Sequence, residues 1–322
     1  MTKKITILTP VFNEEANLPL YEKAVSDILL SCQEYDFQIL FIDDGSTDRS
    51  WSIILDISTR NPHNFQGIRL SRNYGSHIAL SAGFDNATDG EAIATLACDL
   101  QDPPEVILEF LEKWRAGAQI VWGKRRTRED KLWKILTSKI FSKLMYNYAM
   151  PRNSKFTTGS FLLVDKKVAH CFRQFRESNR ITFALVAWTG FEQVAVDYDR
   201  RQRKAGKSGW NLSKMLKTAY DAFIGFSATP IRLVTWLGIT TSLLGVPMLL
   251  YIVFSWLVGS PVRGYTSIMA IIIVFFSIQF FLMGLMGEYL YRIYAEAVRR
   301  PLYFVSNTTK LDSPERRNSH VN

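Results

Sequence analysis

The sequence predicts an α/β domain with a mostly parallel sheet, followed by a pair of membrane-spanning helices. Before Pro230, short apolar runs alternate with longer helical patterns, and this alternation is typical of α/β proteins. After Pro230, two apolar stretches follow one another, and each is longer than the roughly 20 residues that cross a bilayer. The 322 residues suffice for one large domain and an appendage.

The α/β part divides into elements of ordinary length. The predicted strands are residues 4–9, 37–42, 66–70, 91–97 and 119–122. The predicted helices between them are residues 17–32, 48–59, 76–87 and 104–114. Ligands of such sheets bind at the carboxyl ends of the strands, so the residues that follow each predicted strand are the candidates for a site.

Acidic and amide side chains gather at three of these strand ends. They are Asn13, Glu14, Asp43, Asp44, Asp99 and Asp102. Oxygen ligands of this kind suit a hard divalent cation that holds a diphosphate. Each segment taken alone also fits an ordinary turn or helix cap. Their succession in front of two membrane helices favours a binding site.

The two apolar stretches, residues 233–257 and 267–291, contain no charged residue before Glu288. Lys and Arg are frequent on both outer flanks, whereas the connection between the stretches holds one cation, Arg263. Because cytoplasmic flanks carry the excess of positive charge, we expect a multi-pass protein of the inner (plasma) membrane with its large domain and both termini in the cytoplasm. The expected parts are a domain at 1–205, a juxtamembrane amphipathic segment at 206–229, two transmembrane helices within 230–294 and a cytoplasmic tail at 295–322.

Amino-acid composition only partly narrows the classes of molecule that the protein could bind. The net charge of +9 indicates anionic partners, a class that includes nucleic acids, phosphorylated ligands and acidic membrane surfaces. The three cysteines, Cys32, Cys98 and Cys171, are scattered and show no CxxC spacing, so neither a disulfide framework nor a zinc site is expected. Homo-oligomerisation is left open.

Seven motifs, which together extend over nearly the whole chain, carry a resemblance to a known family. In order they read TPVFNEEANL, FIDDGSTDRS, RLSRNYGSHIALSAGFDNA, DLQDPPE, WGKRRTRED, TGSFLLVDKKV and RKAGKSGW. With the two spans that follow, they resemble the family 2 inverting glycosyltransferases of the GT-A (Rossmann-like) fold. The likeness is greatest to the branch of dolichol-phosphate mannose synthases and bactoprenol glucosyltransferases, and the two-span tail resembles the latter.

This resemblance implies a polyprenyl-phosphate hexosyltransferase that works at the lipid bilayer and binds no nucleic acid. It implies a nucleotide-sugar donor such as UDP-glucose, a polyprenyl phosphate acceptor such as undecaprenyl phosphate, and Mg²⁺ or Mn²⁺. The product would be a lipid-linked sugar for export and glycan modification. The residues implied at the donor are Pro10, Phe12, Glu14, Asp43 and Asp44 at the nucleoside, with Asp99 and Gln101 as metal ligands and catalytic residues at the diphosphate. The residues implied at the donor and acceptor phosphates are Arg125, Arg128, Arg203, Lys207 and Ser208, of which the first two are expected to be catalytic.

Two positions depart from the family's pattern. Ala97 stands two residues before Asp99, where the family usually has an Asp, and this weakens the case for a paired-carboxylate metal site. Thr157 stands before Thr158 and Gly159, where the family often has an Asp, and this weakens the case for a catalytic base. A lipid monophosphate, however, loses its second proton near pH 6 by analogy with phosphoamino acids, so it is already a nucleophile near pH 7.

Two other classes of function share some of these features. A processive polysaccharide synthase would have the same nucleotide-binding edge, but the sequence has no QxxRW motif and two spans make a poor translocation channel. A non-catalytic membrane scaffold would be consistent with the two departures. The retained Asp99 and Gln101 and the basic segments argue against a scaffold.

Overall fold

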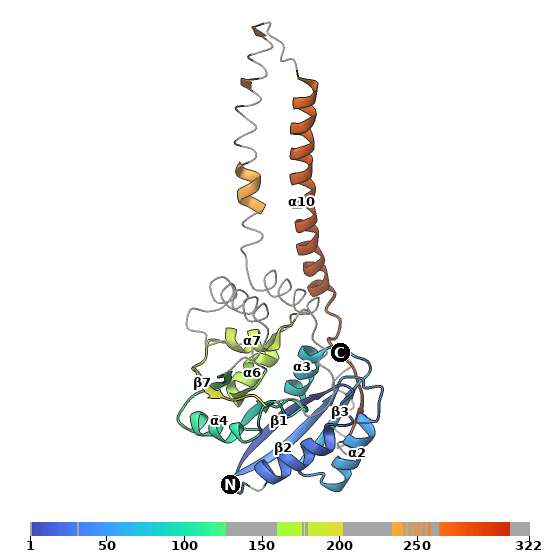
Figure 1. Cartoon of the computed structure of the whole chain (residues 1–322), viewed down its shortest axis with the longest axis vertical. Coiled ribbons are helices and arrows are strands. Elements are labelled where there is room, and N and C mark those ends of the chain that lie inside the picture. The colour runs from blue at the N-terminus through green and yellow to red at the C-terminus, as the bar shows by residue number, and fades with distance from the viewer. Residues whose placement is uncertain are drawn as a thin grey trace. The chain divides into compact units, whose positions relative to one another are not determined.

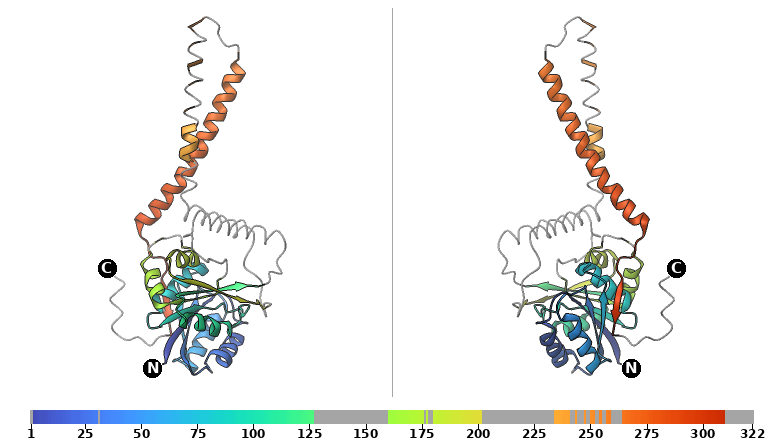
Figure 2. Two further views of the ribbon diagram at one scale, coloured as in Figure 1. Left: turned by 90° about the vertical axis from the view of Figure 1, so that its left-hand side faces the viewer. Right: turned by 90° about the vertical axis from the view of Figure 1, so that its right-hand side faces the viewer.

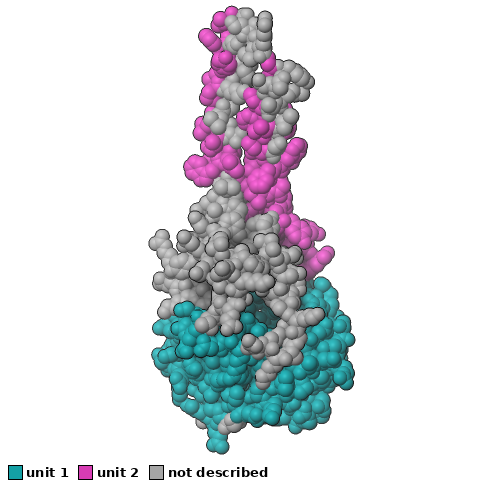
Figure 3. Space-filling model, in the orientation of Figure 1, with its two compact units in different colours: residues 1–217, 301–322 teal, residues 218–300 magenta. Residues whose placement is uncertain are grey.

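The computed structural model describes residues 2–30, 32–126, 160–175, 177, 180–201, 234–240 and 264–309, and single residues between 243 and 258. Its internal contacts divide it into two units, shown in Figure 3. The first unit comprises Met1–Lys217 and Pro301–Asn322, and the second comprises Thr218–Arg300. All the described strands belong to the first unit, so the candidate site lies there.

The first unit is built on one eight-stranded sheet in the order β7-β5-β6-β4-β1-β2-β3-β8 (Figure 1). The strands are β1 (Lys3–Val11), β2 (Tyr35–Asp43), β3 (Phe65–Leu70), β4 (Ala92–Thr95), β5 (Ile120–Arg125), β6 (Leu162–Asp165), β7 (Gln193–Tyr198) and β8 (Val305–Thr308). Strand β6 pairs antiparallel with both β4 and β5, and β8 pairs antiparallel with β3. The other six run in one direction. The sheet is therefore mixed, and the expectation of a mostly parallel sheet is right for the strands that carry the predicted site.

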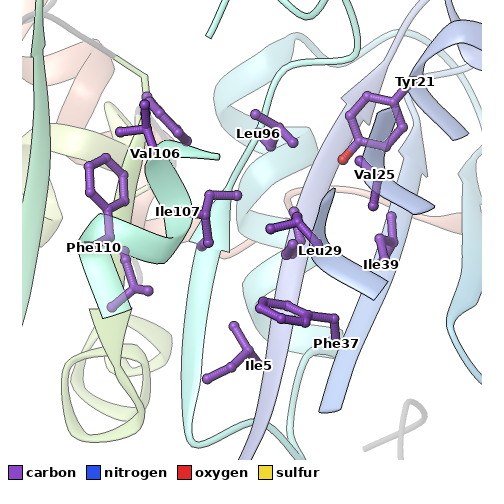
Figure 4. Packing of buried hydrophobic residues seen from close by; sticks show 14 of the residues in the cluster. Ile5, Tyr21, Val25, Leu29, Phe37, Ile39, Leu96, Val106, Ile107 and Phe110 are labelled. Atoms are coloured by element: carbon purple, nitrogen blue, oxygen red, sulfur yellow. The ribbon is translucent and has the colours of Figure 1, made fainter. Parts of the chain in front are cut away.

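Helices cover both faces of this sheet (Figure 2). They are α1 (Leu18–Val25), which continues as the π-helix η1 (Ser26–Leu30), α2 (Ser50–Arg60), α3 (Ser76–Asn86), α4 (Val106–Arg115), α6 (Lys166–Gln174) and α7 (Thr182–Trp188). On one face, α1, α2 and α4 bury a core that includes Ile5, Phe37, Ile39 and Phe110 (Figure 4). The helices predicted at 17–32, 48–59, 76–87 and 104–114 are thereby confirmed to within a few residues.

Helix α3 packs on the opposite face, against β1 and β2. Contact is close because Gly83 has no side chain: a Cβ there would lie 2.9 Å from Cδ1 of Ile42 and 3.1 Å from Cδ1 of Leu8. The alternation of side chains along a strand explains why Phe41 and Ile42, which are neighbours in the sequence, are buried on different faces. Helix α3 thus packs closely on β1 and β2.

The C-terminal strand β8 lies within the tail predicted at 295–322. Beyond Val298 the chain returns to the sheet, and Val305–Thr308 extends it at the edge of β3. The N–H of Thr309 donates to the carbonyl of Gly67 at 2.9 Å, and the N–H of Ser71 donates to the carbonyl of Phe304 at 2.9 Å. A strand edge offers unpaired N–H and C=O groups, and β8 satisfies those of β3. Its polar sequence, VSNT, carries no strand signal in isolation.

The described part of the second unit is chiefly one long helix, α10 (Tyr265–Val298). Within it, Val274–Val298 is long and apolar enough to cross a membrane, judged by length and composition. The second predicted span, residues 267–291, is helical as expected and lies inside α10. Most of the first predicted span and all of the segment 206–229 lie outside the described residues, so the two-helix hairpin stays a prediction.

Candidate functional site

The predicted polar residues follow three strands that lie side by side. Strand β1 pairs in parallel with β2 on one side and with β4 on the other, so the carboxyl ends of all three meet at one edge of the sheet. Strands β3, β5 and β7 end at the same edge, because they run in the same direction. The edge therefore carries, in order from β3 to β7, every described residue of the predicted site.

The loops after β1 and β2 are fastened to each other by side-chain hydrogen bonds. The N–H of Asn13 donates to Oγ of Ser46 at 2.9 Å, and its side-chain oxygen accepts from the N–H of Thr47 at 2.9 Å. Asn13 adopts the left-handed conformation (φ 54°), which Asn tolerates better than most residues. The N–H of Glu14 donates to Oγ of Ser50 at 2.9 Å. The two motifs thus form one rigid wall rather than two independent turns.

Three residues predicted at the nucleoside are carried by this wall. Pro10 is half-buried near the end of β1, and Glu14 is half-buried with its carboxylate accepting from the side-chain amide of Asn17 at 2.5 Å. Phe12 is 43% exposed, which is unusual for a Phe beside a buried strand. An exposed aromatic ring at this edge offers a surface on which a flat ligand can pack.

Asp43 closes β2 and is completely buried. Its Oδ1 accepts from the N–H of Ser46 at 3.0 Å, and Nε of Arg69 lies 3.1 Å from its Oδ2. Burial raises the pKa of Asp43, while the hydrogen bonds with Ser46 and the charge of Arg69 act to lower it. Among the described residues Oδ2 has no hydrogen-bond partner and faces only the Arg69 guanidinium, and the whole residue is shielded from solvent. The structure thus places Asp43 behind the site, where it anchors β3 to the loop after β2.

Asp44 holds the loop that follows β3. Its Oδ1 accepts from the N–H of Tyr74 at 2.7 Å and its Oδ2 accepts from the N–H of Gly75 at 2.8 Å. Burial raises the pKa of Asp44, and the two hydrogen bonds oppose that effect. The Arg72 guanidinium stacks over the Tyr74 ring at 4.3 Å. The loop 71–75 is therefore organised around the Asp44 carboxylate; it is hereafter the donor loop, after the nucleotide-sugar donor that the sequence resemblance leads us to expect beside it.

Gly75 and Gly45 allow the donor loop to take this path. Gly75 has φ 95° and ψ 155°, a conformation that is essentially restricted to glycine. Gly45 has φ 69°, and a Cβ there would lie 2.5 Å from the carbonyl carbon of Arg72. Close approach of the two loops depends on both glycines.

His77, in the first turn of α3, is a half-buried residue that sequence reasoning missed. Its ring packs edge-on against Phe183 at 5.7 Å, and among the described residues its buried Nδ1 has no hydrogen-bond partner. Burial lowers the pKa of His77 to about 4, so the ring is neutral near pH 7. It adds no positive charge to the donor loop.

The loop after β4 contains the predicted metal ligands. Asp99 is half-buried, and its Oδ1 accepts from the N–H of Gln101 at 3.2 Å. Between them Leu100 has φ 53°, a strained value for a Leu and a frequent mark of functional loops. Within the described residues, no group of three or more His, Cys, Asp or Glu side chains is placed to bind a metal ion. One carboxylate and one amide suffice for Mg²⁺ only if phosphate oxygens and water supply the remaining ligands, which is the usual arrangement for that ion.

Arg125, at the end of β5, is linked to this loop through a tyrosine. Nε of Arg125 donates to the hydroxyl of Tyr198 at 3.4 Å, and that hydroxyl donates to Oδ1 of Asp102 at 2.5 Å. Nε of Arg200 lies 3.5 Å from the same carboxylate oxygen. Burial and the Asp102 carboxylate raise the pKa of Tyr198, so its hydroxyl keeps its proton. The sequence analysis missed Tyr198 and Arg200, and the signal that could have identified them is a short apolar run followed closely by arginines.

Four predicted site residues, Arg128, Arg203, Lys207 and Ser208, lie outside the described residues, as does Thr157. The structure brings together Pro10, Phe12, Glu14, Asp44, Asp99, Gln101 and Arg125 at one edge of the sheet, with Asp43 behind it. The roles of these residues stay predictions.

Comparison with known proteins identifies the family. Residues 6–173 match the family model described as Glycosyl transferase family 2. An uncharacterized glycosyltransferase from Synechocystis sp. is 37% identical over 317 residues, which cover 97% of this chain and 98% of the relative. The bactoprenol glucosyl transferase of Shigella phage SfV is 35% identical over 306 residues, which cover 94% of this chain and 98% of the relative. Among solved structures, mannosyl-3-phosphoglycerate synthase from Rubrobacter xylanophilus has a TM-score of 0.46 at 15% identity and covers 68% of this chain and 71% of its own. The chain is thus a glycosyltransferase and belongs to glycosyl transferase family 2.

Proposed function

We propose that this protein transfers glucose from UDP-glucose to a polyprenyl phosphate, with inversion at the anomeric carbon. The observation that carries the proposal is the order of the loops along one edge of the sheet. Loops suited to a nucleoside follow β1, β2 and β3, the Asp99 loop follows β4, and arginines follow β5 and β7. A nucleoside, its diphosphate and an acceptor phosphate would fit this edge in the same order. The full-length likeness to a bactoprenol glucosyl transferase supports the lipid acceptor.

Asp99 and Gln101 would hold Mg²⁺ or Mn²⁺ at the donor diphosphate. The ion would supply positive charge for the departing nucleoside diphosphate. The half-burial of Asp99 and the hydrogen bond to its Oδ1 from the N–H of Gln101 orient that carboxylate. Ala97 removes a second carboxylate from the loop, so Asp99 carries most of the ligand charge.

The chain's own residues chiefly place the two substrates. The acceptor phosphate, which is a dianion near pH 7 by analogy with phosphoamino acids, attacks the anomeric carbon from the face opposite the diphosphate. A bond forms between a phosphate oxygen and that carbon, and the bond from the carbon to the diphosphate oxygen breaks. Because the nucleophile carries no proton, the absence of an Asp at Thr157 is compatible with turnover. Arg125 and the predicted Arg128, Arg203, Lys207 and Ser208 would bind the phosphates, and arginine forks suit phosphate oxygens.

The acceptor is a membrane lipid, so the proposal includes the bilayer. Two spans, a cytoplasmic catalytic domain and both termini in the cytoplasm are supported by the distribution of Lys and Arg and by helix α10. Such a protein would receive the donor from the cytosol and the acceptor from the inner (plasma) membrane.

A transfer assay tests the proposal. The protein in detergent, with Mg²⁺ and polyprenyl phosphate, is given radiolabelled UDP-glucose, UDP-galactose or GDP-mannose in parallel. Lipid-extractable monosaccharide, greatest with UDP-glucose, is the expected result. Polymer would identify a processive synthase, and no transfer from any donor would identify a scaffold.

A further inference from the structure

The loop 99–105 contacts the last residue of β7 and the segment that follows β7 at three places. The carbonyl of Gln101 accepts from the N–H of Arg201 at 2.8 Å. Asp102 accepts from the hydroxyl of Tyr198 at 2.5 Å, and Arg201 forms an ion pair with Glu105. Two strands, β6 and β5, separate β4 from β7 in the sheet, so these contacts bridge the edge where the phosphates are proposed to bind.

The pair formed by Asp102 and Tyr198 lies at the centre of this bridge. Asp102 is 1% exposed and Tyr198 is 3% exposed. The tyrosine ring cannot shift readily, because it packs edge-on against Phe161 at 5.4 Å, and a Cβ on Gly123 would lie 2.9 Å from its Cε1. The hydroxyl position is therefore set by packing, and the carboxylate position is set by the hydroxyl.

Two arginines converge on this pair. Nε of Arg125 donates to the tyrosine hydroxyl at 3.4 Å, and Nε of Arg200 lies 3.5 Å from Asp102 Oδ1. Within the described part of the chain, these are the contacts of the two guanidinium groups, and both are made by Nε rather than by a terminal nitrogen. Each terminal nitrogen carries two N–H donors, which is the arrangement that binds phosphate oxygens in pairs.

We infer that Arg200 is a second phosphate-binding arginine beside Arg125, and that Asp102 and Tyr198 are positioning residues that hold both arginines at the metal-binding loop. This inference rests on the proposed function. It goes beyond that function because it names the buried pair, Asp102 and Tyr198, that positions the arginines for the acceptor phosphate. Asp102 then does not bind the metal. It fixes the distance between the diphosphate, held at Asp99, and the incoming phosphate.

Two variants and one matched control test the inference. Tyr198→Phe removes the hydroxyl that joins Arg125 to Asp102, and Arg200→Gln removes one phosphate-binding cation. Tyr303→Phe is the control, since Tyr303 also donates to a carboxylate, Oδ2 of Asp85, at 3.1 Å, and burial likewise raises the pKa of its hydroxyl. The control pair lies away from the loop 99–105.

The measurements separate acceptor binding from donor binding and from folding. Calorimetry gives the affinity for UDP-glucose with Mg²⁺, titration in detergent gives the affinity for farnesyl phosphate, and kinetics give KM and kcat for that acceptor. Both variants should weaken farnesyl phosphate binding and raise its KM about tenfold, the effect expected from one charge-assisted hydrogen bond, with UDP-glucose affinity within about twofold of wild type. Tyr303→Phe should leave all three unchanged.

Several outcomes would overturn the inference. Unchanged farnesyl phosphate affinity in both variants would remove Arg200 and the pair from the acceptor site. An equal loss of donor and acceptor affinity would assign the pair a purely structural role. If Tyr198→Phe does not fold, Arg200→Gln alone decides. Wild-type protein that binds farnesyl phosphate but transfers no sugar would refute the proposed function. The farnesyl phosphate affinities of the variants would still test whether these residues bind the acceptor phosphate.

Discussion

Replacement of Gly75 by Ala should weaken donor binding through the backbone alone. A Cβ at Gly75 would meet no atom within 4 Å, so no steric clash is involved. The cost comes from φ 95° and ψ 155°, where a residue with a side chain is destabilised by about 1–3 kcal/mol. If the peptide rotates to relieve that strain, the N–H of Gly75 leaves Asp44 Oδ2, and a hydrogen bond to a charged group worth about 1.5–3 kcal/mol is lost.

Retained backbone strain and loss of the hydrogen bond to Asp44 each destabilise the native conformation of the donor loop by a similar free energy. Since about 1.4 kcal/mol corresponds to a factor of ten, a disturbance of about 1–3 kcal/mol should lower UDP-glucose affinity about five- to 150-fold in Gly75→Ala. The free energy of unfolding should fall by about 1–3 kcal/mol. Calorimetry with UDP-glucose and Mg²⁺ measures the first quantity, and urea denaturation followed by tryptophan fluorescence measures the second.

Gly117→Ala is the matched control. Gly117 has φ 107° and equally open space around the position of a Cβ, but it lies in the turn after α4, near the amino end of β5. It should lose similar stability and keep the donor affinity of wild type. Equal donor affinity in the two variants would refute the role of the donor loop, whatever the change in stability.

Three further predictions concern the metal, a buried charge and the topology. Asp99→Asn should fold normally and lose most turnover, and EDTA should abolish wild-type activity; full activity in EDTA would remove the metal from the mechanism. Arg69→Met should lower the free energy of unfolding by about 3 kcal/mol at about pH 8, because it leaves the buried Asp43 carboxylate without its cation. Since burial raises the pKa of Asp43 above its unfolded value, folding favours the neutral carboxyl, and the loss should shrink as the pH is lowered toward the pKa of Asp43; a loss that does not change with pH in urea denaturation would contradict this. A cysteine placed at Ser260 should react with an impermeant maleimide from outside the cell while one at Asn322 should not, and the reverse pattern would overturn the topology.

Much of the sheet could be predicted from the sequence because the signals are local. Strands β1 to β5 and the helices between them are continuous patterns of buried side chains, and their boundaries agree within a few residues. Strands β6, β7 and β8 were not predicted. The four residues of β6 pair with β4 and β5, and those of β8 pair with β3, far away in the sequence. No local periodicity records such pairings.

The candidate site was also predicted only in part. Sequence reasoning located the carboxylates at the strand ends, but it could not tell which of them would face a ligand. Asp44 accepts from the N–H groups of Tyr74 and Gly75, which lie about 30 residues further along the chain. Asp43 is committed to Arg69 in the same manner. Whether an acidic residue binds a ligand or a neighbouring loop depends on distant contacts, and these become visible only in the folded chain.

Because β8 follows α10 in the chain, the sheet of this enzyme is completed only late in synthesis. The N–H of Gly67 in β3 donates to the side-chain hydroxyl of Thr309, which lies 242 residues further along the chain. Strand β3 therefore cannot pair with β8 until those residues have been translated. At about 5–20 residues per second, that wait is on the order of tens of seconds. The apolar helix α10 leaves the ribosome before β8 does. A ribosome that stalls before α10 is complete therefore releases a sheet whose β3 edge is open beside the donor loop, and the sheet is completed only in chains in which α10 has already been made.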